Sequence, residues 1–320
     1  MIASRHKSAC HIDRLPKVRG SYTPLAALAP TTWFRVGGPA EMLYVPADAE
    51  DLSAFLLEKP KDLPITVIGL ASNLLIRDGG IPGITIKLGR AFNTIEADKQ
   101  IIRCGGSAVD AAVSIAARDC AIAGLEFLTG IPGTIGGAIR MNAGAYGREL
   151  RDVFEVAVAL DQTGSLHKLS IQDMGFDYRH CIIPNNWIFI SAQLRGIPGD
   201  RDSITKRIRK IRAEREEVQP VHSRTGGSTF ANPSETKAWK LIDEVGCRGL
   251  TRGGAKISEK HCNFLVNTGT AKASDLEDLG DEVRRRVRDA TGIALSWEVR
   301  RVGVADTNEN APLHRLKAHR

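Results

Sequence analysis

A glycine-rich stretch, "GIPGTIGGAIRMNAGAYG" at residues 130–147, constrains the fold more than any other part of the sequence. Its repeated glycines are unsuited to a regular helix along the whole stretch, and they let the backbone approach a flat or extended ligand closely. Pro132 stiffens one turn, and Asn142 tolerates unusual backbone angles. Because long irregular loops inside compact domains are usually functional, the stretch favours a ligand site over an ordinary turn.

A second loop, "GLASNLLIRDGG" at residues 69–80, follows an apolar, β-branched segment at Ile65–Ile68 that predicts a buried strand. Gly69 ends this strand, and Ser72 and Asn73 follow with small polar side chains. Successive backbone N–H groups in such a turn form an anion-binding nest. Alone, the loop is equally consistent with a simple connection between strands. Together, the two loops suggest a pyrophosphate-containing cofactor bound by backbone.

The common nucleotide-binding motifs are missing from the sequence. No Gly-x-Gly-x-x-Gly opens a helix after a strand, and no Gly-x-x-x-x-Gly-Lys-Ser/Thr is present. Neither a Rossmann dinucleotide fold nor a P-loop is therefore supported. The six cysteines are scattered and form no Cys-x-x-Cys pair, which indicates reduced thiols and neither a disulfide framework nor a zinc site.

The length and charge of the chain limit the classes of function. A chain of 320 residues predicts two or three domains. The net charge of +7 and the pI of about 9.2 suit either nucleic acid or small substrates that carry phosphates. Only 5% of the residues are aromatic, which argues against a platform for single-stranded nucleic acid. We predict small-molecule substrates and no nucleic-acid partner.

The N-terminal residues "MIASRHKSACHIDRLP" include charges but no apolar segment of the kind found in signal peptides. No uninterrupted apolar run in the sequence is long enough to span a bilayer. We therefore expect a cytoplasmic protein without membrane association.

The order of the expected elements favours an α+β fold. Strands are expected at Met42–Val45, Ile65–Ile68, Val153–Leu160, His167–Ser170, Trp187–Leu194 and within "LSWEVRRVG" at 295–303. One helix should begin at the N-cap Asp48, and another should begin with Ser107 and Asp110 as a capping pair. A helix within residues 202–219 presents Ile204, Ile208 and Ile211 on one face and ends at Pro220.

These elements divide the chain into four predicted regions. Residues 1–20 are expected to be a flexible basic leader, and residues 305–320 a polar tail. Residues 21–215 form one domain in two subdomains that separate near 78–88, and residues 216–304 form a C-terminal α+β domain. The boundary falls at the end of the amphipathic helix.

Ser228 stands in "TGGSTFANP" at residues 225–233, after two glycines and before an aromatic residue and an Asn-Pro turn. From these residues alone it could be a nucleophile, part of a phosphate-binding loop, or a serine that bonds local backbone in a tight turn. No Gly-x-Ser-x-Gly motif surrounds it, which argues against a nucleophile.

Several motifs occur in one order from about residue 31 to residue 304: "TWFRVGGPAEMLYVP", "GLASNLLIRDGG", "GIPGTIGGAIRMNAGAYG", "DYRH", "TGGSTFANP", "GGAKISEKHCNFLVN" and "WEVRRVG". In this order they resemble the UDP-N-acetylenolpyruvoylglucosamine reductase family of bacterial peptidoglycan synthesis, in its shorter, type II branch. The resemblance implies an FAD-binding domain of the vanillyl-alcohol-oxidase type in two subdomains, followed by a substrate domain. It also implies non-covalent FAD and NADPH as electron donor. Separately, we expect the protein to be a monomer.

The resemblance assigns three catalytic residues. NADPH reduces FAD in this family, and the reduced flavin then passes hydride to the enolpyruvyl double bond. Ser228 would donate the proton, while Arg179 and Glu298 would stabilise the enolate that develops. On their own, an arginine before a strand and a glutamate on a strand are commonly solvated. Glu298 should point to the opposite face of its strand from Trp297 and Val299.

The binding residues follow from the same loops and motifs. The expected cofactor contacts are Gly69, Ala71, Ser72, Asn73, Leu74, Pro132, Gly133, Thr134, Gly136, Gly137, Ala138, Asn142, Gly144 and Arg224. The expected substrate contacts are Tyr178, Asn232, Lys256, His261 and Arg300. No metal site is expected, because His261 and Cys262 are adjacent and lack further ligands.

One position departs from the family's pattern. After "STF" the family commonly has Lys-Asn-Pro, whereas Ala231 stands here before Asn232. The substrate contact of that lysine must be absent or supplied elsewhere.

Two other classes of function compete with the reductase. Another flavoprotein of the same fold could oxidise a 2-hydroxy acid or an alcohol, but its flavin is often attached to His or Cys, and neither occurs in the two glycine loops. A basic nucleotide- or nucleic-acid-binding module would not explain the motifs around Arg179, Ser228 and Glu298.

Overall fold

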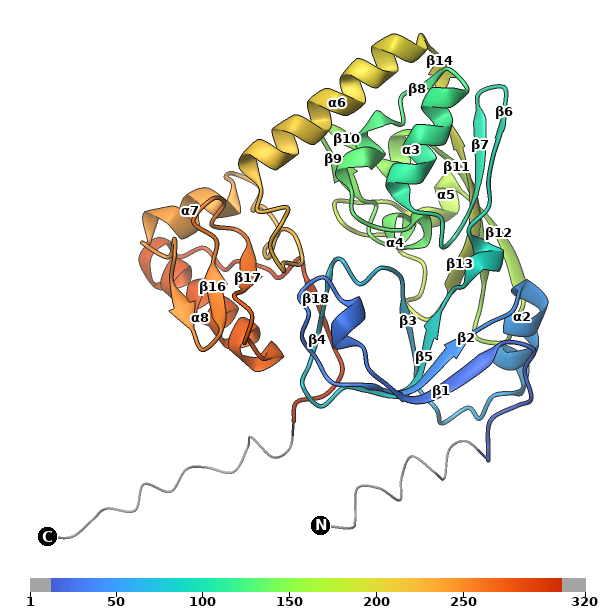
Figure 1. Ribbon diagram of the computed structural model, residues 1–320, viewed down its shortest axis with the longest axis horizontal. Helices are drawn as coiled ribbons and strands as arrows, with labels where there is room; N and C mark the ends of the chain where they lie inside the picture. The colour runs from blue at the N-terminus through green and yellow to red at the C-terminus, as the bar shows by residue number, and fades with distance from the viewer. Residues whose placement is uncertain (1–12, 307–320) are drawn as a thin grey trace, which may run out of the picture.

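The computed structural model describes residues 13–306, and its first sheet is built from the apolar segments near the N-terminus (Figure 1). In spatial order its strands are β1 (Ser21–Ala26), β2 (Ala40–Val45), β5 (Ile81–Lys87) and β3 (Ile65–Ile68). Helix α2 (Ala49–Glu58) packs on this sheet through Leu52, Phe55 and Leu56. The predicted cap is confirmed, since Asp48 accepts a hydrogen bond from the N–H of Asp51.

Residues 13–20 differ from the flexible leader that we expected. The carboxylate of Asp51 accepts hydrogen bonds from the backbone N–H groups of Arg19 and Gly20, at 2.7 and 3.0 Å. Leu15 and Val18 pack against the same core as α2. This segment is therefore anchored to the first sheet, while residues 1–12 and 307–320 of the predicted leader and tail lie outside the described part.

The second sheet is antiparallel and follows the first in the chain. In spatial order its strands are β12 (Leu166–Ser170), β11 (Phe154–Leu160), β13 (Ile188–Arg195), β7 (Ile101–Gly105) and β6 (Ile95–Asp98). Its core also includes apolar residues of α3 (Asp110–Asp119), of α4 (Ile135–Arg140) and of the 3-10 helix η3 (Glu126–Gly130). The glycine-rich stretch thus contains one short helix between irregular turns.

The capping pair predicted for α3 is wrong. Its N-cap residue is Val109, whose side chain cannot accept a hydrogen bond, and Asp110 is already the first helical residue. The hydroxyl of Ser107 donates to the carbonyl of Gly89 at 2.9 Å instead. The turn between β7 and α3 folds back on the 89–93 segment, so a long-range contact replaces the local cap.

Short elements connect the two sheets and the rest of the chain. They are η1 (Ala29–Thr31), β4 (Leu74–Ile76), η2 (Arg90–Phe92), β8 (Ile122–Ala123), β9 (Gly144–Ala145), β10 (Arg148–Glu149), η4 (Leu150–Asp152), α5 (Ile171–Met174) and β14 (Ile197–Pro198).

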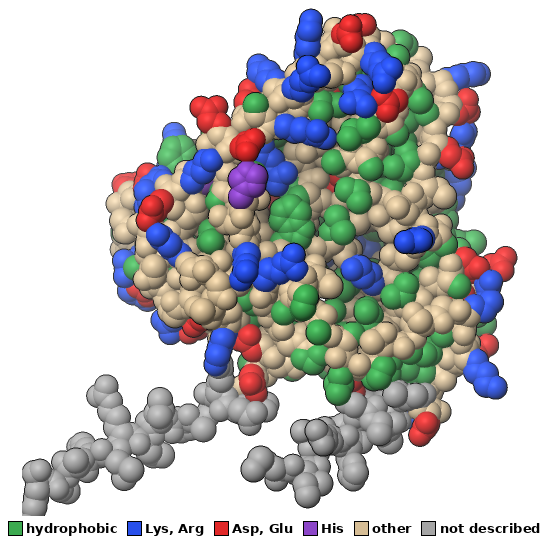
Figure 2. Space-filling model, in the orientation of Figure 1, with side chains coloured by type: hydrophobic (Ala, Val, Ile, Leu, Met, Phe, Trp, Pro, Cys, Tyr) green, Lys and Arg blue, Asp and Glu red, His purple; other side chains and the backbone are tan. Residues whose placement is uncertain are grey.

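Helix α6 (Arg201–Val218) leads from the second sheet to the C-terminal body. Its buried residues are Ile204, Ile208 and Ile211, as their spacing predicts. Figure 2 shows Lys and Arg side chains with acidic ones among them along its outer face. This mixture fits a solvated face.

The C-terminal body is small and has its own apolar core. Its elements are α7 (Ala238–Glu244), β15 (Thr251–Arg252), β16 (Ala255–Ile257), β17 (Leu265–Asn267) and α8 (Ala273–Thr291). On α8 the buried Leu276, Leu279, Val283 and Val287 recur at helical spacing and face the core. The mixture of helices and antiparallel strands agrees with the predicted α+β class.

The chain finally returns to the N-terminal domain. Strand β18 (Arg300–Val302) pairs in parallel with β4. The strand predicted from residue 295 is thus shorter than expected, because residues 295–299 form only an isolated bridge between Trp297 and Phe230. Within residues 13–306, no helix combines the length and apolar character that crossing a membrane requires.

Candidate active site

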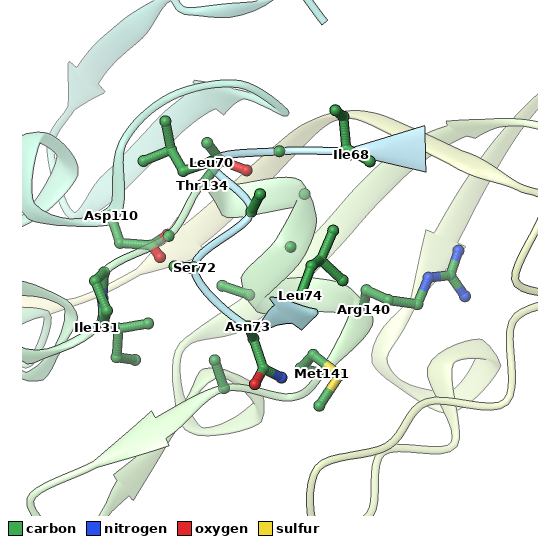
Figure 3. Close-up of a pocket in the computed structure, with 18 of the residues that line it drawn as sticks. Ile68, Leu70, Ser72, Asn73, Leu74, Asp110, Ile131, Thr134, Arg140 and Met141 are labelled. Carbon is green, nitrogen blue, oxygen red and sulfur yellow. The ribbon is translucent and has the colours of Figure 1, made fainter. Parts of the chain in front are cut away.

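A cavity of about 590 Å³ lies where the two sheets, the turn at 226–228 and the returning chain meet. This size is in the range of small-molecule and cofactor sites. The loops at 69–74 and 130–138 line one long part of it, and Figure 3 shows them facing one another. The cavity is therefore built largely from the two loops that the sequence singled out.

Glycine is required where these loops approach other groups. A Cβ atom on Gly69 would lie 2.7 Å from the hydroxyl of Thr134, and one on Gly133 would lie 2.7 Å from the Asp110 carboxyl. On Gly106, in the turn before α3, a Cβ would collide with the backbone carbonyl of Phe189. The backbone thus comes close to its neighbours and remains exposed to a ligand.

Nearly all the predicted cofactor residues line this cavity. They are Gly69, Ala71, Ser72, Asn73, Leu74, Pro132, Gly133, Thr134, Gly136, Gly137, Ala138 and Gly144. Asn142 and Arg224 are not among the residues that line it.

Asn142 instead supports the neighbouring backbone. It is fully buried and has a positive φ of 40°. Its side-chain amide donates to Glu149 and to the carbonyl of Asp177, each at 3.0 Å. Because Asp177 lies two residues before Arg179, Asn142 helps to fix the segment that carries this arginine.

The three predicted catalytic residues line the same cavity. Nε of Arg179 lies 3.1 Å from Oε1 of Glu298, and its Nη2 donates to the carbonyl of Gly144 at 2.9 Å. Arg179 has a left-handed φ of 54°, which is uncommon for a non-glycine residue and often marks a functional position. We call Arg179, Ser228 and Glu298 the polar corner.

Backbone hydrogen bonds bring Ser228 and Glu298 together, although they lie far apart in the sequence. The N–H of Glu298 donates to the carbonyl of Thr229, next to Ser228, at 2.8 Å. Phe230 pairs with Trp297 through an isolated bridge, and their ring centroids are 5.2 Å apart. The turn with Ser228 is thus held beside the segment with Glu298.

The 69–74 loop is joined to this segment as well. The side-chain amide of Asn73 donates to the carbonyl of Glu298 at 3.2 Å, and the N–H of Arg300 donates to the carbonyl of Asn73 at 3.0 Å. These two hydrogen bonds therefore join the 69–74 loop of the cavity directly to the segment that carries Glu298.

Burial raises the pKa of Glu298 above its ordinary value, although the nearby Arg179 opposes this shift. Its side chain is only 14% exposed. A carboxyl group in this environment can accept or release a proton closer to neutral pH than a solvated glutamate can.

A smaller recess of about 280 Å³ adjoins the polar corner. Tyr178, Arg300, Ala231 and Arg140 are among the residues that line it. Asn232, a predicted substrate contact, lines neither cavity, but its Nδ2 lies 3.5 Å from the hydroxyl of Tyr178.

Lys256 and His261 line neither cavity, although we expected them to contact the substrate. Lys256 pairs with Glu259 at 2.6 Å. The ring of His261 packs against Phe264 with centroids 4.8 Å apart. These interactions direct both side chains into contacts within the C-terminal body.

The sequence reasoning missed a further set of residues that line the larger cavity: Lys87, Leu88, Gly89, Arg90, Asn93, Ser107, Asp110, Arg140, Asn185, Trp187 and Gln219. Most of them carry no motif of their own. Asp110 could have been identified from the sequence, because it follows the Gly105-Gly106-Ser107 turn. An aspartate after such a turn can face a ligand as well as cap a helix. Residues 13–306 contain no group of three or more His, Cys, Asp or Glu side chains placed to hold a metal ion.

Models of two known protein families match separate parts of the chain. The model of an FAD binding domain matches residues 40–170. The model of the C-terminal domain of UDP-N-acetylenolpyruvoylglucosamine reductase matches residues 219–302.

Curated relatives and a solved structure extend the likeness over most of the chain. The UDP-N-acetylenolpyruvoylglucosamine reductase of Parvibaculum lavamentivorans is 56% identical over 93% of this chain and 96% of its own length. That of Rhodospirillum rubrum is 55% identical over 92% and 93%. The crystal structure of the reductase from Thermus caldophilus superposes with a TM-score of 0.77 at 31% identity, covering 90% of this chain and all of that one.

The cavity also fits FAD on its own geometry. Two glycine-containing loops present backbone at positions where a Cβ would collide, and the lining combines apolar residues with polar and charged side chains that can bind a dinucleotide. The predicted FAD-binding fold and the predicted cofactor are confirmed. The chain therefore belongs to the UDP-N-acetylenolpyruvoylglucosamine reductase family, FAD-containing oxidoreductases of peptidoglycan precursor synthesis.

Proposed function

We propose that this protein uses NADPH to reduce the enolpyruvyl double bond of UDP-N-acetylglucosamine enolpyruvate, with Arg179, Ser228 and Glu298 as catalytic residues. One observation carries the proposal: these three residues line the same cavity as the loops that fit FAD. When bound, FAD would accept electrons from NADPH and supply hydride to the double bond.

Arg179 would stabilise the negative charge that develops on the substrate. Hydride addition to the methylene carbon of the double bond leaves negative charge on the carbon that bears the carboxylate, delocalised onto the carboxylate oxygens as an enolate, so a fixed cation beside that group lowers the barrier. The guanidinium is held by Glu298 and by the carbonyl of Gly144. Because these contacts fix its plane, little reorganisation is needed when charge develops.

Ser228 would donate the proton to the α-carbon of the enolate, which is the carbon that bears the carboxylate. A serine hydroxyl is a weak acid, so proton transfer must be coupled to the developing charge and to the neighbouring polar groups. Gly227, with a φ of 81°, sets the turn that presents Ser228 to the cavity. The proposed role is thus a proton donor and not a nucleophile.

Glu298 would orient Arg179 and exchange a proton at the same place. Its raised pKa, caused by burial, favours the protonated form more than in a solvated glutamate. Such a group can resupply the proton that Ser228 gives up.

The recess beside the polar corner would take the UDP part of the substrate. Arg300 hydrogen bonds to Asn185 at 2.8 Å, and Arg140 donates to the carbonyl of Trp187 at 2.9 Å. Both guanidinium groups line the recess and bring positive charge to it. These two arginines could supply the positive charge of the lysine that the family commonly has at the position of Ala231.

Tyr178 and Asn232 stay our predictions for substrate contacts at the mouth of this recess. The monomeric state, the absence of a nucleic-acid partner and the cytoplasmic location also stay predictions. Size-exclusion chromatography tests the first of them directly.

The test of the catalytic assignment separates the two half-reactions. Ser228→Ala should keep bound FAD and its reduction by NADPH near wild type, while oxidation of the reduced flavin by the enolpyruvyl sugar slows by about 10²–10⁴-fold. Stopped-flow absorbance measures both steps. Ser296→Ala is the control, because Ser296 is an exposed serine close to Glu298 that does not line the cavity. Fast oxidation in Ser228→Ala would remove the proton-donor role.

A further inference from the structure

Asp110 stands out among the buried polar groups of the described residues. Buried side-chain oxygens without a hydrogen-bond partner occur in residues 13–306 at Thr85, Asp110, Ser114, Asn186 and Thr225. Of these residues, only Asp110 lines the larger cavity. It is also the only one with an acidic side chain, and neither of its carboxyl oxygens is paired.

The surroundings of Asp110 leave the carboxyl group beside the glycine loops. Its N–H donates to the carbonyl of Gly133 at 3.1 Å, and a Cβ on Gly133 would lie 2.7 Å from its Oδ2. Figure 3 shows the side chain directed into the space between Thr134, Ser72 and Ile131. All these residues line the cavity.

Such a position disfavours an ionised carboxylate. Asp110 is fully buried, and no cation or N–H group among the described residues stabilises a charge on it. Burial of an unpaired carboxylate costs far more free energy than burial of the neutral acid. Burial accordingly raises the pKa of Asp110 well above its ordinary value. A neutral carboxyl group has an O–H donor, which requires an acceptor.

The cavity ligand can provide that acceptor. On the proposed catalytic assignment, the flavin ring would lie at the polar corner, where the substrate would react. Arg140 and Met141 also line the adjoining recess, and Figure 3 shows them on the far side of the 69–74 loop from Asp110. The diphosphate and ribose of an extended FAD would therefore reach the loops beside Asp110. An ionised carboxylate there would repel the diphosphate, whereas a neutral one can donate to it.

We propose that Asp110 contacts FAD as a neutral carboxyl group and donates a hydrogen bond to an oxygen of the diphosphate–ribose part. This contact is a side-chain contribution to a site otherwise formed largely by backbone. The inference rests on the binding of FAD and is independent of which substrate is reduced.

Equilibrium binding of FAD to the apoprotein tests the contact. Asp110→Asn keeps the shape of the side chain and an N–H donor, so the Kd for FAD should stay within about threefold of wild type. Asp110→Ala removes the donor and should weaken binding by about tenfold or more. The control is Ser114→Ala, which removes another buried, unpaired oxygen from α3 at a position that does not line the cavity. It should bind FAD as wild type does.

Two outcomes would overturn the inference. If Asp110→Asn binds as weakly as Asp110→Ala, a neutral hydrogen-bond donor at this position is not what binds FAD. If all variants bind alike, Asp110 does not contact FAD. If the wild-type protein failed to bind FAD, the assignment of the cofactor itself would be contradicted. This outcome differs from the two above, in which the wild-type protein binds FAD.

A second measurement on the wild-type protein does not depend on how well the alanine variant folds. Infrared difference spectra with and without FAD should show the C=O stretch of a protonated carboxyl group shifting when FAD binds. The band should be missing from Asp110→Asn. A purely structural role would leave this band unmoved by FAD, and a carboxylate band in its place would contradict the inference.

Discussion

The larger cavity has two parts of opposite construction. The loops at 69–74 and 130–138 present mainly backbone and small side chains, whereas the polar corner presents the charged Arg179 and Glu298 together with Ser228. The loops are local in the sequence, and their glycines give each its shape. The polar corner is assembled from three distant segments: backbone hydrogen bonds join the segments of Ser228 and Glu298, and a side-chain hydrogen bond joins Arg179 to Glu298.

This difference suggests a division of labour. The backbone part would determine what is bound, because its shape excludes side chains at positions such as Gly69 and Gly133. The polar corner would determine which reaction follows. Variants of one part should therefore leave the function of the other largely intact.

The largest effect is expected from the polar corner. Arg179→Ala should keep bound FAD but slow the oxidation of reduced flavin by the enolpyruvyl sugar by about 10²–10³-fold, the usual loss when one group that stabilises an oxyanion is removed. Rapid-mixing absorbance measures this rate. Arg248→Ala is a suitable control, because Arg248 is a surface residue paired with Asp243. Loss of FAD from Arg179→Ala would show that the two parts are not separable.

A smaller loss is expected from the backbone part. In Gly106→Ala, the new methyl group would collide with the Phe189 carbonyl, and overpacking of this kind costs about 1–3 kcal/mol of unfolding free energy. The FAD affinity should fall as well, because Gly106 lines the cavity. Urea unfolding of the apoprotein and FAD titration measure the two losses. Unchanged values would mean that the turn relaxes without consequence.

The burial of the Asp110 carboxyl group predicts that the stability of the apoprotein depends on pH. Its native pKa is raised by burial, so above the ordinary pKa of about 4 the native state binds more protons than the unfolded state. The contribution to the unfolding free energy is then lost as pH rises, at up to about 1.4 kcal/mol per pH unit. Asp110→Asn cannot ionise, so its advantage over wild type should grow from pH 4 towards pH 7. Parallel stability curves would contradict a raised pKa.

The smallest effect is expected from a variant of Gly137, which should change FAD affinity and apoprotein stability in opposite directions. Gly137 lies inside α4, and a Cβ there would make only an ordinary contact with Thr134, at 3.7 Å. Gly137→Ala should therefore stabilise the apoprotein by up to about 1 kcal/mol through helix propensity. The FAD affinity should fall, because the methyl group enters the cavity wall. Tighter binding of FAD would mean that Gly137 faces away from the cofactor.

Much of the cavity could be predicted from local sequence. The glycine pattern identified both loops, and the family resemblance placed Arg179, Ser228 and Glu298 in one site. These features depend on residues near one another in the chain or on motifs that the family shares. The strand alternation predicted for Glu298 is not confirmed, because residues 295–299 form no strand and Trp297 lines the smaller recess together with Glu298.

The remaining features depend on long-range packing. Ser107 was expected to cap α3, but its hydroxyl bonds to Gly89 because the turn lies on the 89–93 segment. Asp110 is the first residue of α3 and lines the cavity with both carboxyl oxygens unpaired. Lys256 and His261 stand in a matching motif, yet nearby partners hold both away from the cavity. Spacing alone cannot reveal such competing partners.

The visible absorption spectrum of the purified protein tests the central claim most directly. It should be recorded before and after anaerobic NADPH, and again after UDP-N-acetylglucosamine enolpyruvate is added. We predict a flavin spectrum that bleaches with NADPH and returns with the enolpyruvyl sugar. A flavin that bleaches but is not restored by the sugar would contradict the proposed reaction, and a protein that binds no FAD would contradict the account of the cavity.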